Sequence, residues 1–341
     1  MEAQQHYVAS VRWSNRQFAR TTDTHGTMIH FQKCYSTIQE LFECSHKFKI
    51  NEFLPAYQTP LRFLDIACAP GGFSQYLLDH FLDSQGYGIT LPESLGGFPM
   101  AVQAYPSSRF KICFFDLLSH PMRLNPTLLE KVHLVIGDAQ YFPRSQEAIE
   151  EYKGKKAGTI TGGRLGLLLK EFILGFQNLQ EGGIFIFRFV VWERVHSNII
   201  RLFFLCFDLF ESVQPFKSEY QHTADCTFYA VCCGFRRAKY NQLDVKTLLE
   251  VAYARVVLSP PFAAVHNGTI NCFRVIQIQS ERVDSGPDPL LDKPDAQILE
   301  NLYPFTIMRD HPFFKSTCEM FEYVYKMFLI GQSSYTDHYR A

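Results

Sequence analysis

The sequence lacks several patterns by which common protein classes are recognised. None of its ten cysteines forms a C-x-x-C pair, so neither a zinc site nor a disulfide framework is indicated. No apolar run approaches the roughly 18 residues of a membrane span, and residues 1–20 are too polar for a signal peptide. We therefore expect an intracellular protein, cytoplasmic or nuclear, with no membrane contact, no metal and buried reduced cysteines.

The chain also lacks an excess of either charge and shows no internal repeat. Its formal net charge is −1, so a nucleic-acid partner would have to be held by a local basic patch. The remaining composition is that of a globular protein. With 341 residues, of which 47% are hydrophobic and 15% aromatic, the chain can bury one large core and an appended region.

Short apolar runs alternate with helical patterns over residues 63–235, which is the rhythm of a parallel sheet covered by helices on both faces. The expected strands are 63–67, 85–90, 110–114, 132–136, 183–191 and 227–233. The expected core-facing helices are 73–82 and 165–179, and the second ends before Gly182-Gly183, a typical helix C-terminal signal. These patterns predict an α/β fold.

Two further regions flank this core. A segment ending in a helix at 28–44 precedes it, and the last part of the chain closes with an aromatic helical pattern at 313–330. We therefore expect three parts: an N-terminal extension and helix at 1–45, a central domain at 46–240, and a mainly helical C-terminal accessory region at 241–341.

The stretch FLDIACAPGGFSQYLL, residues 63–78, joins an apolar strand to a glycine turn and an amphipathic helix. Ligands bind at this place in a doubly wound sheet, because glycines let a ligand approach the backbone while amide groups and the helix dipole face it. The turn is not G-x-G-x-x-G, and no GKS or GKT follows, which disfavours a dinucleotide or a triphosphate. Asp65 would suit the ammonium group of an amino-acid moiety, which favours S-adenosyl-L-methionine (SAM); the alternative is a ligand-free turn.

The sequence resembles the FtsJ/RrmJ-type SAM-dependent ribose 2′-O-methyltransferases, a family that includes rRNA and mRNA-cap enzymes. The resemblance covers roughly residues 28–237. It depends on four segments in order: LDIACAPGGFSQYL; VHLVIGDAQ; LGLLLKEFILGFQNL running into QEGGIFIFRFVVWE; and KSEYQHTADCTFYAVCCGFR. It implies a Rossmann-like class I methyltransferase fold, with a mostly parallel seven-stranded sheet, helices on both faces, and SAM at the carboxyl ends of the first strands.

The resemblance implies that SAM contacts the glycine turn and the ends of the next two strands. Asp116 stands where the family uses a carboxylate to accept the adenine amino group, although a turn cap is the alternative. Where many members place an acid for the ribose hydroxyls, this chain offers Ile89 or Thr90. A side chain at Gly71 or Gly72 would fill the space of the methionine moiety. The expected cofactor residues are Asp65, Ala67, Cys68, Pro70, Gly71, Gly72, Phe73, Thr90, Asp116 and Leu117.

The family uses a Lys-Asp-Lys-Glu catalytic tetrad, which this chain matches only in part. Asp138 matches the aspartate, Arg188 replaces the second lysine, and Thr227 stands where the glutamate belongs. The first lysine corresponds to Lys33, for which an exposed surface lysine is an equal alternative. An inward arginine in an apolar strand needs a partner, and Asp138 is the obvious one. A guanidinium stays protonated, so Arg188 could orient and stabilise but could hardly act as a base; a purely structural ion pair is the alternative.

The implied reaction needs little covalent chemistry, because proximity and stabilisation of the developing alkoxide supply much of the acceleration. Three functions remain open. They are SAM-dependent methylation of RNA ribose 2′-hydroxyls of the rRNA or cap type, methylation of a small-molecule acceptor, and a catalytically inactive binding protein with the FtsJ fold. The oligomeric state and the methyl acceptor are not indicated by the sequence.

A basic loop is the local patch that could grip RNA phosphates. The segment YKGKKAGTITGGR carries Lys153, Lys155, Lys156 and Arg164, and it lies between Asp138 and the following helix. A solvated mobile loop explains the same charges equally well.

Overall fold

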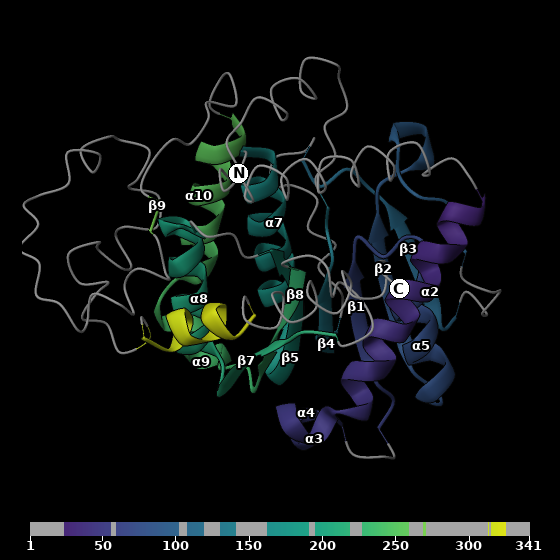
Figure 1. Ribbon diagram of the computed structural model, residues 1–341, viewed down its shortest axis with the longest axis horizontal. Helices are drawn as coiled ribbons and strands as arrows, with labels where there is room; N and C mark the ends of the chain where they lie inside the picture. Colours follow the sequence, from purple (N-terminus) through teal and green to yellow (C-terminus); the bar gives the residue numbers. More distant parts are fainter. Residues whose placement is uncertain are drawn as a thin grey trace, which may run out of the picture.

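The computed structural model describes residues 24–55, 59–101, 108–118, 130–140, 162–190, 195–218, 227–258, 269–270, 313 and 315–324. Its core is a seven-stranded sheet with the strand order β3-β2-β1-β4-β5-β8-β7 (Figure 1). The strands are β1 (Arg62–Ile66), β2 (Gln85–Thr90), β3 (Phe110–Phe114), β4 (Val132–Gly137), β5 (Leu179–Val190), β7 (Ser212–Phe216) and β8 (Thr227–Cys233). Neighbouring strands run parallel except at β8, which is antiparallel to both β5 and β7.

The α/β fold and the mostly parallel seven-stranded sheet are confirmed. The six strands expected from apolar runs are all present, whereas β7 was expected only through the family resemblance. Pro215 interrupts the strand pattern of β7, and it is tolerated there because β7 lies at an edge of the sheet.

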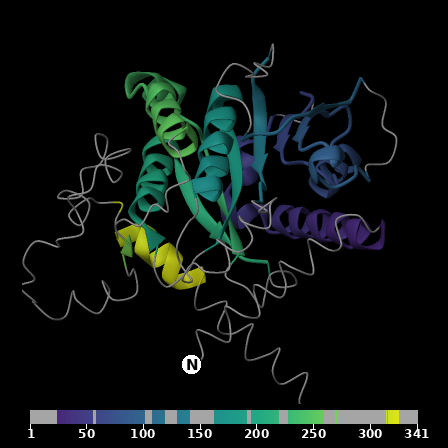
Figure 2. The same cartoon turned by 90° about the horizontal axis from the view of Figure 1, so that it is seen from above.

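Helices cover both faces of the sheet. Figure 2 shows α7 (Gly162–Asn178), α8 (Ser197–Leu209) and α10 (Val245–Leu258) on one face, with α2 (Thr24–Glu43) and α5 (Gly72–His80) on the other. The remaining short elements are α3 (Ser45–Phe48), α4 (Ile50–Phe53), η1 (Glu93–Leu95), β6 (Val195–His196), α9 (Arg237–Gln242) and β9 (Thr269–Ile270). Residues 315–324 are helical, inside the aromatic pattern expected at the end of the chain. None of the helices in the described part of the chain is long and apolar enough to cross a membrane.

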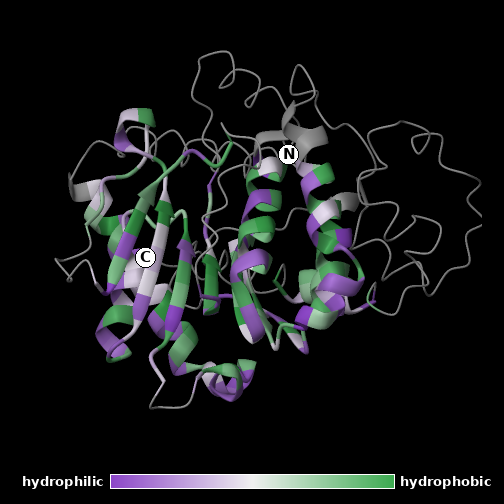
Figure 3. Ribbon diagram, turned by 180° about the vertical axis from the view of Figure 1, so that it is seen from behind, coloured by the Kyte–Doolittle hydropathy of each residue, from purple (hydrophilic) through white to green (hydrophobic). Residues whose placement is uncertain are grey.

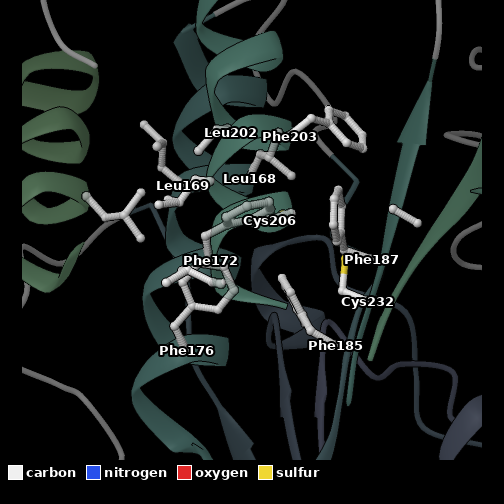
Figure 4. Close-up of a cluster of buried hydrophobic side chains, with 14 of the residues drawn as sticks. Leu168, Leu169, Phe172, Phe176, Phe185, Phe187, Leu202, Phe203, Cys206 and Cys232 are labelled. Carbon is white, nitrogen blue, oxygen red and sulfur yellow. The ribbon is translucent and has the colours of Figure 1, made fainter. Parts of the chain in front are cut away.

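The alternation of strand side chains divides the core into two layers. On β5, Phe185 and Phe187 face α7 and α8, where the rings of Phe185 and Phe172 meet edge to face at 5.4 Å (Figure 4). Ile184 and Ile186 point to the opposite layer, beneath α2 and α5. The helices that cover these layers carry bands of hydrophobic and hydrophilic residues, as amphipathic helices do (Figure 3).

The expected helix 165–179 ends within one residue of the end of α7, but the Gly182-Gly183 pair is not its stop signal. Helix α7 ends at Asn178, whose side-chain amide donates a 2.9 Å hydrogen bond to the carbonyl oxygen of Leu174. Strand β5 begins at the next residue, and its register against β4 shifts at this level. The glycine pair therefore forms an irregularity inside a strand, with Gly182 at φ +72°.

The expectation that every cysteine is buried holds for most of the described ones. Cys232 and Cys233 are buried on opposite faces of β8. The two exceptions are Cys44, which is half-buried, and Cys113, which lies on the edge strand β3 and is exposed.

Helix α2 packs directly on the start of α5, and Gly72 makes this contact possible. A Cβ at Gly72 would lie 2.7 Å from both the Cβ of Cys34 and the backbone nitrogen of Tyr35, and it would also meet the carbonyl oxygen of Phe31. The expectation that a side chain at Gly72 would fill cofactor space is therefore corrected: it would enter helix α2.

We predict that Gly72→Ala destabilises the fold by about 1–3 kcal/mol, because backbone atoms of α2 cannot move away cheaply. Gly182→Ala is the control, since a Cβ there meets nothing within 4 Å and adds only the strain of a positive φ, about 1 kcal/mol. Urea unfolding measures both. A Gly72→Ala midpoint equal to that of the parent would contradict the packing argument.

Candidate active site

The glycine turn after β1 brings backbone groups to the carboxyl edge of the sheet. Ala67 has φ +65°, and Gly71, the residue before α5, has φ +107°, a conformation that favours glycine. The amide of Cys68 donates to the carbonyl oxygen of Ile89 at 3.0 Å, and that of Ala101 donates to Pro70 at 2.9 Å. The turn is thereby held between the end of β2 and the segment that follows η1.

Asp65 is a buried carboxylate beneath this turn, with one oxygen lacking a partner among the described residues. Its Oδ2 accepts a 2.6 Å hydrogen bond from the Ser74 hydroxyl, whereas its Oδ1 is buried and has no hydrogen bond. Burial raises the pKa of Asp65 to about 7, and the negative charge of Asp138 adds to the shift. A cation placed at Oδ1 would satisfy this oxygen and favour the ionised form.

The centre of the site is an ion pair between Asp138 and Arg188. The Nε of Arg188 lies 3.0 Å from Oδ1 of Asp138, and the side chains are 11% and 7% exposed. With its amide oxygen turned to the guanidinium, Gln140 accepts from Nη1 at 2.8 Å. The hydroxyl of Tyr229, the residue opposite Arg188 on β8, donates to Asp138 Oδ1 at 3.3 Å. The buried pair therefore has further hydrogen-bond partners from strand β8 and from the loop after β4.

Helix α2 presents His30 and Cys34 to the same carboxylate. Their ligand atoms and a carboxylate oxygen of Asp138 all lie within 4.8 Å of one another, a grouping that could hold a metal ion. The guanidinium of Arg188 on Asp138 disfavours a divalent cation, because it already supplies a positive charge there. Burial raises the pKa of the Cys34 thiol well above its usual range, with Asp138 and Asp65 adding to the shift, so this sulfur stays protonated near neutral pH.

The other two expected tetrad residues, Lys33 and Thr227, lie on α2 and β8, the elements that also carry Cys34 and Tyr229. Lys33 is exposed on α2 beside Cys34, where its charge slightly opposes the rise in the thiol pKa. Thr227 begins β8, and its carbonyl oxygen accepts a 2.8 Å hydrogen bond from the buried Lys217 ammonium. On β8 the residue hydrogen-bonded to Asp138 is Tyr229, two positions after Thr227.

The expected adenine side of the pocket forms after β3. Asp116 Oδ1 accepts a 3.0 Å hydrogen bond from the amide of Leu118, so Asp116 does cap a turn. The carbonyl oxygen of buried Leu117 accepts from the hydroxyl of Tyr253 on α10 at 2.8 Å. Thr90 is buried at the end of β2, and its carbonyl oxygen accepts a 2.7 Å hydrogen bond from the amide of Phe115, the residue after β3.

Sequence reasoning missed Glu171, which holds the loop that carries Asp138. Its Oε1 accepts a 2.6 Å hydrogen bond from the amide of Ala139, and its carboxyl group packs under Gly137. Burial raises the pKa of Glu171 well above its usual range, and the negative charge of Asp138 adds to the shift. An acid on the apolar face of a predicted helix was the signal that could have found it.

His30, Cys34 and Tyr229 were also missed as site residues. The i, i+4 spacing of His30 and Cys34 on the predicted helix 28–44 was visible, but periodicity does not say what a helix face meets. The basic loop residues Lys153, Lys155 and Lys156 lie outside the described residues, and Arg164 is half-buried in the first turn of α7.

A seven-stranded sheet with one antiparallel strand, a glycine turn after β1 and a carboxylate at the end of β4 define a Rossmann-like methyltransferase. The chain belongs to the FtsJ-like methyltransferase family, whose model matches residues 41–235. Its cofactor is SAM, which supplies the activated methyl group when bound. The turn fits this cofactor, because buried Oδ1 of Asp65 lacks a partner among the described residues and suits the ammonium group.

The relatives include active and inactive proteins. The chain is 27% identical to the cap-specific mRNA (nucleoside-2′-O-)-methyltransferase 1 of Xenopus laevis over 52% of this chain and 21% of that protein. It is 23% identical to the inactive cap-specific mRNA (nucleoside-2′-O-)-methyltransferase 1B of Caenorhabditis briggsae over 75% of this chain and 27% of that protein. The chain thus spans about a quarter of the length of these relatives.

Solved methyltransferase structures are more distant. Human methyltransferase-like protein 13 in complex with S-adenosylhomocysteine (SAH) is 15% identical, with a TM-score of 0.38, over 68% of this chain and 93% of that chain. The family assignment therefore depends on the family match.

We predict that Asp65 makes the cofactor-free protein less stable as pH rises. A folded-state pKa near 7, raised from 3.8, means that stability is lost between these values, by roughly 2–4 kcal/mol. Asp65→Asn should remove this loss and also weaken SAH binding. Asp83→Asn, at an exposed carboxylate, is the control. Urea unfolding from pH 4 to 8 measures the effect, and parallel curves for Asp65→Asn and the parent would contradict it.

We predict that Asp116 has two separable roles. Asp116→Asn keeps an oxygen for the Leu118 amide but presents an amide donor to the adenine amino group, so SAH affinity should fall roughly ten- to a hundredfold at unchanged stability. Asp116→Ala should lower both affinity and stability. Calorimetry with SAH and thermal melts measure the two effects. Unchanged affinity in Asp116→Asn would remove Asp116 from the adenine site.

Proposed function

We propose that the protein is a SAM-dependent methyltransferase that acts on ribose 2′-hydroxyls of RNA, of the rRNA or cap type. The observation that carries this proposal is the Asp138–Arg188 pair on the same face of the sheet as the glycine turn. In parallel sheets the carboxyl edge is where cofactor and acceptor meet. Relatives of this chain are named cap-specific mRNA methyltransferases, and these names support RNA as the acceptor.

The residues divide the work between orientation and charge. Asp65 and the turn would fix the amino-acid end of the cofactor, and Asp116 the adenine. Asp138 would hold Arg188 in position, and the guanidinium of Arg188 would stabilise the alkoxide that develops as the methyl group arrives. The basic loop with Lys153 would bind phosphates close to this edge.

A second candidate function, a binding protein without catalysis, is favoured by one observation. Arg188 occupies the position of the family's second lysine and is already engaged by Asp138 and Gln140. One relative of this chain is named an inactive methyltransferase. The two functions differ in whether Arg188 can turn from its partners toward a ribose oxygen.

We predict that Asp138→Ala reduces methyl transfer at least about a hundredfold, whereas Arg188→Lys keeps or raises it. The measurement is transfer of labelled methyl from SAM to capped RNA, uncapped RNA and a set of small hydroxyl acceptors, beside thermal melts. The control is Arg62→Lys. Arg62 begins β1, at the end of the strand away from the glycine turn, and its Nη1 lies 2.5 Å from Oε2 of Glu130. This substitution should change neither property much, because exposed pairs contribute little.

The outcomes separate the candidates. Binding of SAH and RNA without transfer would favour the binding protein, and transfer only to a small hydroxyl compound would overturn the RNA acceptor. If the ion pair is purely structural, Asp138→Ala should instead lower stability by up to about 3–5 kcal/mol, as for a fully buried pair.

A further inference from the structure

The proposed reaction releases a proton, and three groups next to Asp138 are poorly suited to accept it. Arg188 is a guanidinium and stays charged at any working pH. Burial raises the pKa values of the Cys34 thiol and the Tyr229 hydroxyl well above their usual ranges, so both groups keep their protons. A group that is neutral near pH 7 and can gain a proton there is still required, and a histidine has that property.

His30 lies at the place where this group is required. Its ring nitrogen lies within 4.8 Å of both a carboxylate oxygen of Asp138 and the sulfur of Cys34. On its other side the imidazole packs against the ring of Phe98, with centroids 4.8 Å apart. The side chain is half-buried, so it can exchange protons with water.

The position of His30 relative to the cofactor turn is set by packing. The next residue, Phe31, has its carbonyl oxygen against Gly72, the first residue of α5. The segment that carries Phe98 continues to Ala101, whose amide bonds to Pro70 of the glycine turn at 2.9 Å. Two independent contacts therefore tie His30 to the turn where the methyl donor binds.

We propose that His30 is the general base of the reaction and that Asp138 orients it and stabilises its protonated form. This inference rests on the proposed function. As the ribose 2′-oxygen bonds to the methyl carbon, the carbon–sulfur bond breaks and its electron pair stays on sulfur. The hydroxyl proton passes to the imidazole and from there to water. One positive charge leaves the sulfonium, and one appears on His30, so the charges balance.

The charged and titratable groups around the cluster of His30, Cys34 and Asp138 come from three strands, from the loop after β4 and from helix α2. They are Asp65 on β1, Asp138 after β4, Arg188 on β5, Tyr229 on β8, and Lys33 and Cys34 on α2. The two aspartates favour the imidazolium, and the guanidinium opposes it.

The decisive measurement is the pH profile of the methyl-transfer rate. In the parent, the rate should fall about tenfold per pH unit on the acid side of the profile, where the base is protonated. His30→Gln should lower the rate at pH 7.5 by about a hundredfold or more and remove the acid limb, at unchanged SAH affinity and thermal stability. His80→Gln is the matched control, a histidine on α5 whose Nδ1 is 3.0 Å from the carbonyl oxygen of Tyr76.

A second readout does not depend on turnover. In histidine-labelled protein, the NMR titration of His30 should shift to lower pH in Asp138→Asn, while the titration of His80 should not move. An unmoved His30 titration would overturn the proposed dyad.

The remaining outcomes also decide the case. Full activity of His30→Gln with an intact acid limb would overturn the base assignment and leave the proposed function standing. Loss of the acid limb in Lys33→Gln but not in His30→Gln would overturn it in favour of the lysine. A parent protein that binds SAH but transfers no methyl group would overturn both the base assignment and the proposed function.

Discussion

The buried pair of Asp138 and Arg188 is the interaction on which the arrangement of the site depends. Taking both charges out of water is costly, and the cost is offset only if each lone pair and proton finds a partner. The neighbouring elements supply these partners: Tyr229 from β8 bonds the carboxylate, and Gln140 from the loop after β4 bonds the guanidinium. Glu171 accepts a hydrogen bond from the backbone of the same loop, and burial raises its pKa well above the usual range.

The strand pairing explains why these groups meet at all. Side chains alternate between the faces of a strand, and parallel strands end at the same edge. Ile136 and Ile186 lie in the core layer beneath α2 and α5, and Asp138 and Arg188 follow them at the next position of the same parity. Asp65 ends up on this face by the same rule, since Phe63 lies in that layer too.

Much of the fold and part of the site could therefore be predicted from the sequence. Short apolar runs and the glycine turn were enough to predict six strands and the turn, because these features follow from local sequence. The positions of Asp138 and Arg188 came from the family resemblance, and their pairing from the need of an inward arginine for a partner. Strand β7 was hidden by Pro215, and Gly182 was misinterpreted because a glycine pair stops a helix and kinks a strand equally well. His30 and Glu171 were missed because each acts across a helix–sheet contact, which only tertiary packing brings about.

The hydrogen bond from Tyr253 to Leu117 shows that the folded unit extends beyond the part of the chain that matches the family. The family match stops at residue 235, yet Tyr253 on α10 holds the backbone beside Asp116. The Lys170 ammonium lies 4.7 Å from the centre of the Tyr253 ring. Leu117 and Tyr253 are buried in one apolar cluster with α7. A piece of the molecule cut at the limit of homology would therefore lose a contact that holds the backbone next to Asp116. Helix α10, which lies outside the family match, is thus part of the folded unit that carries Asp116.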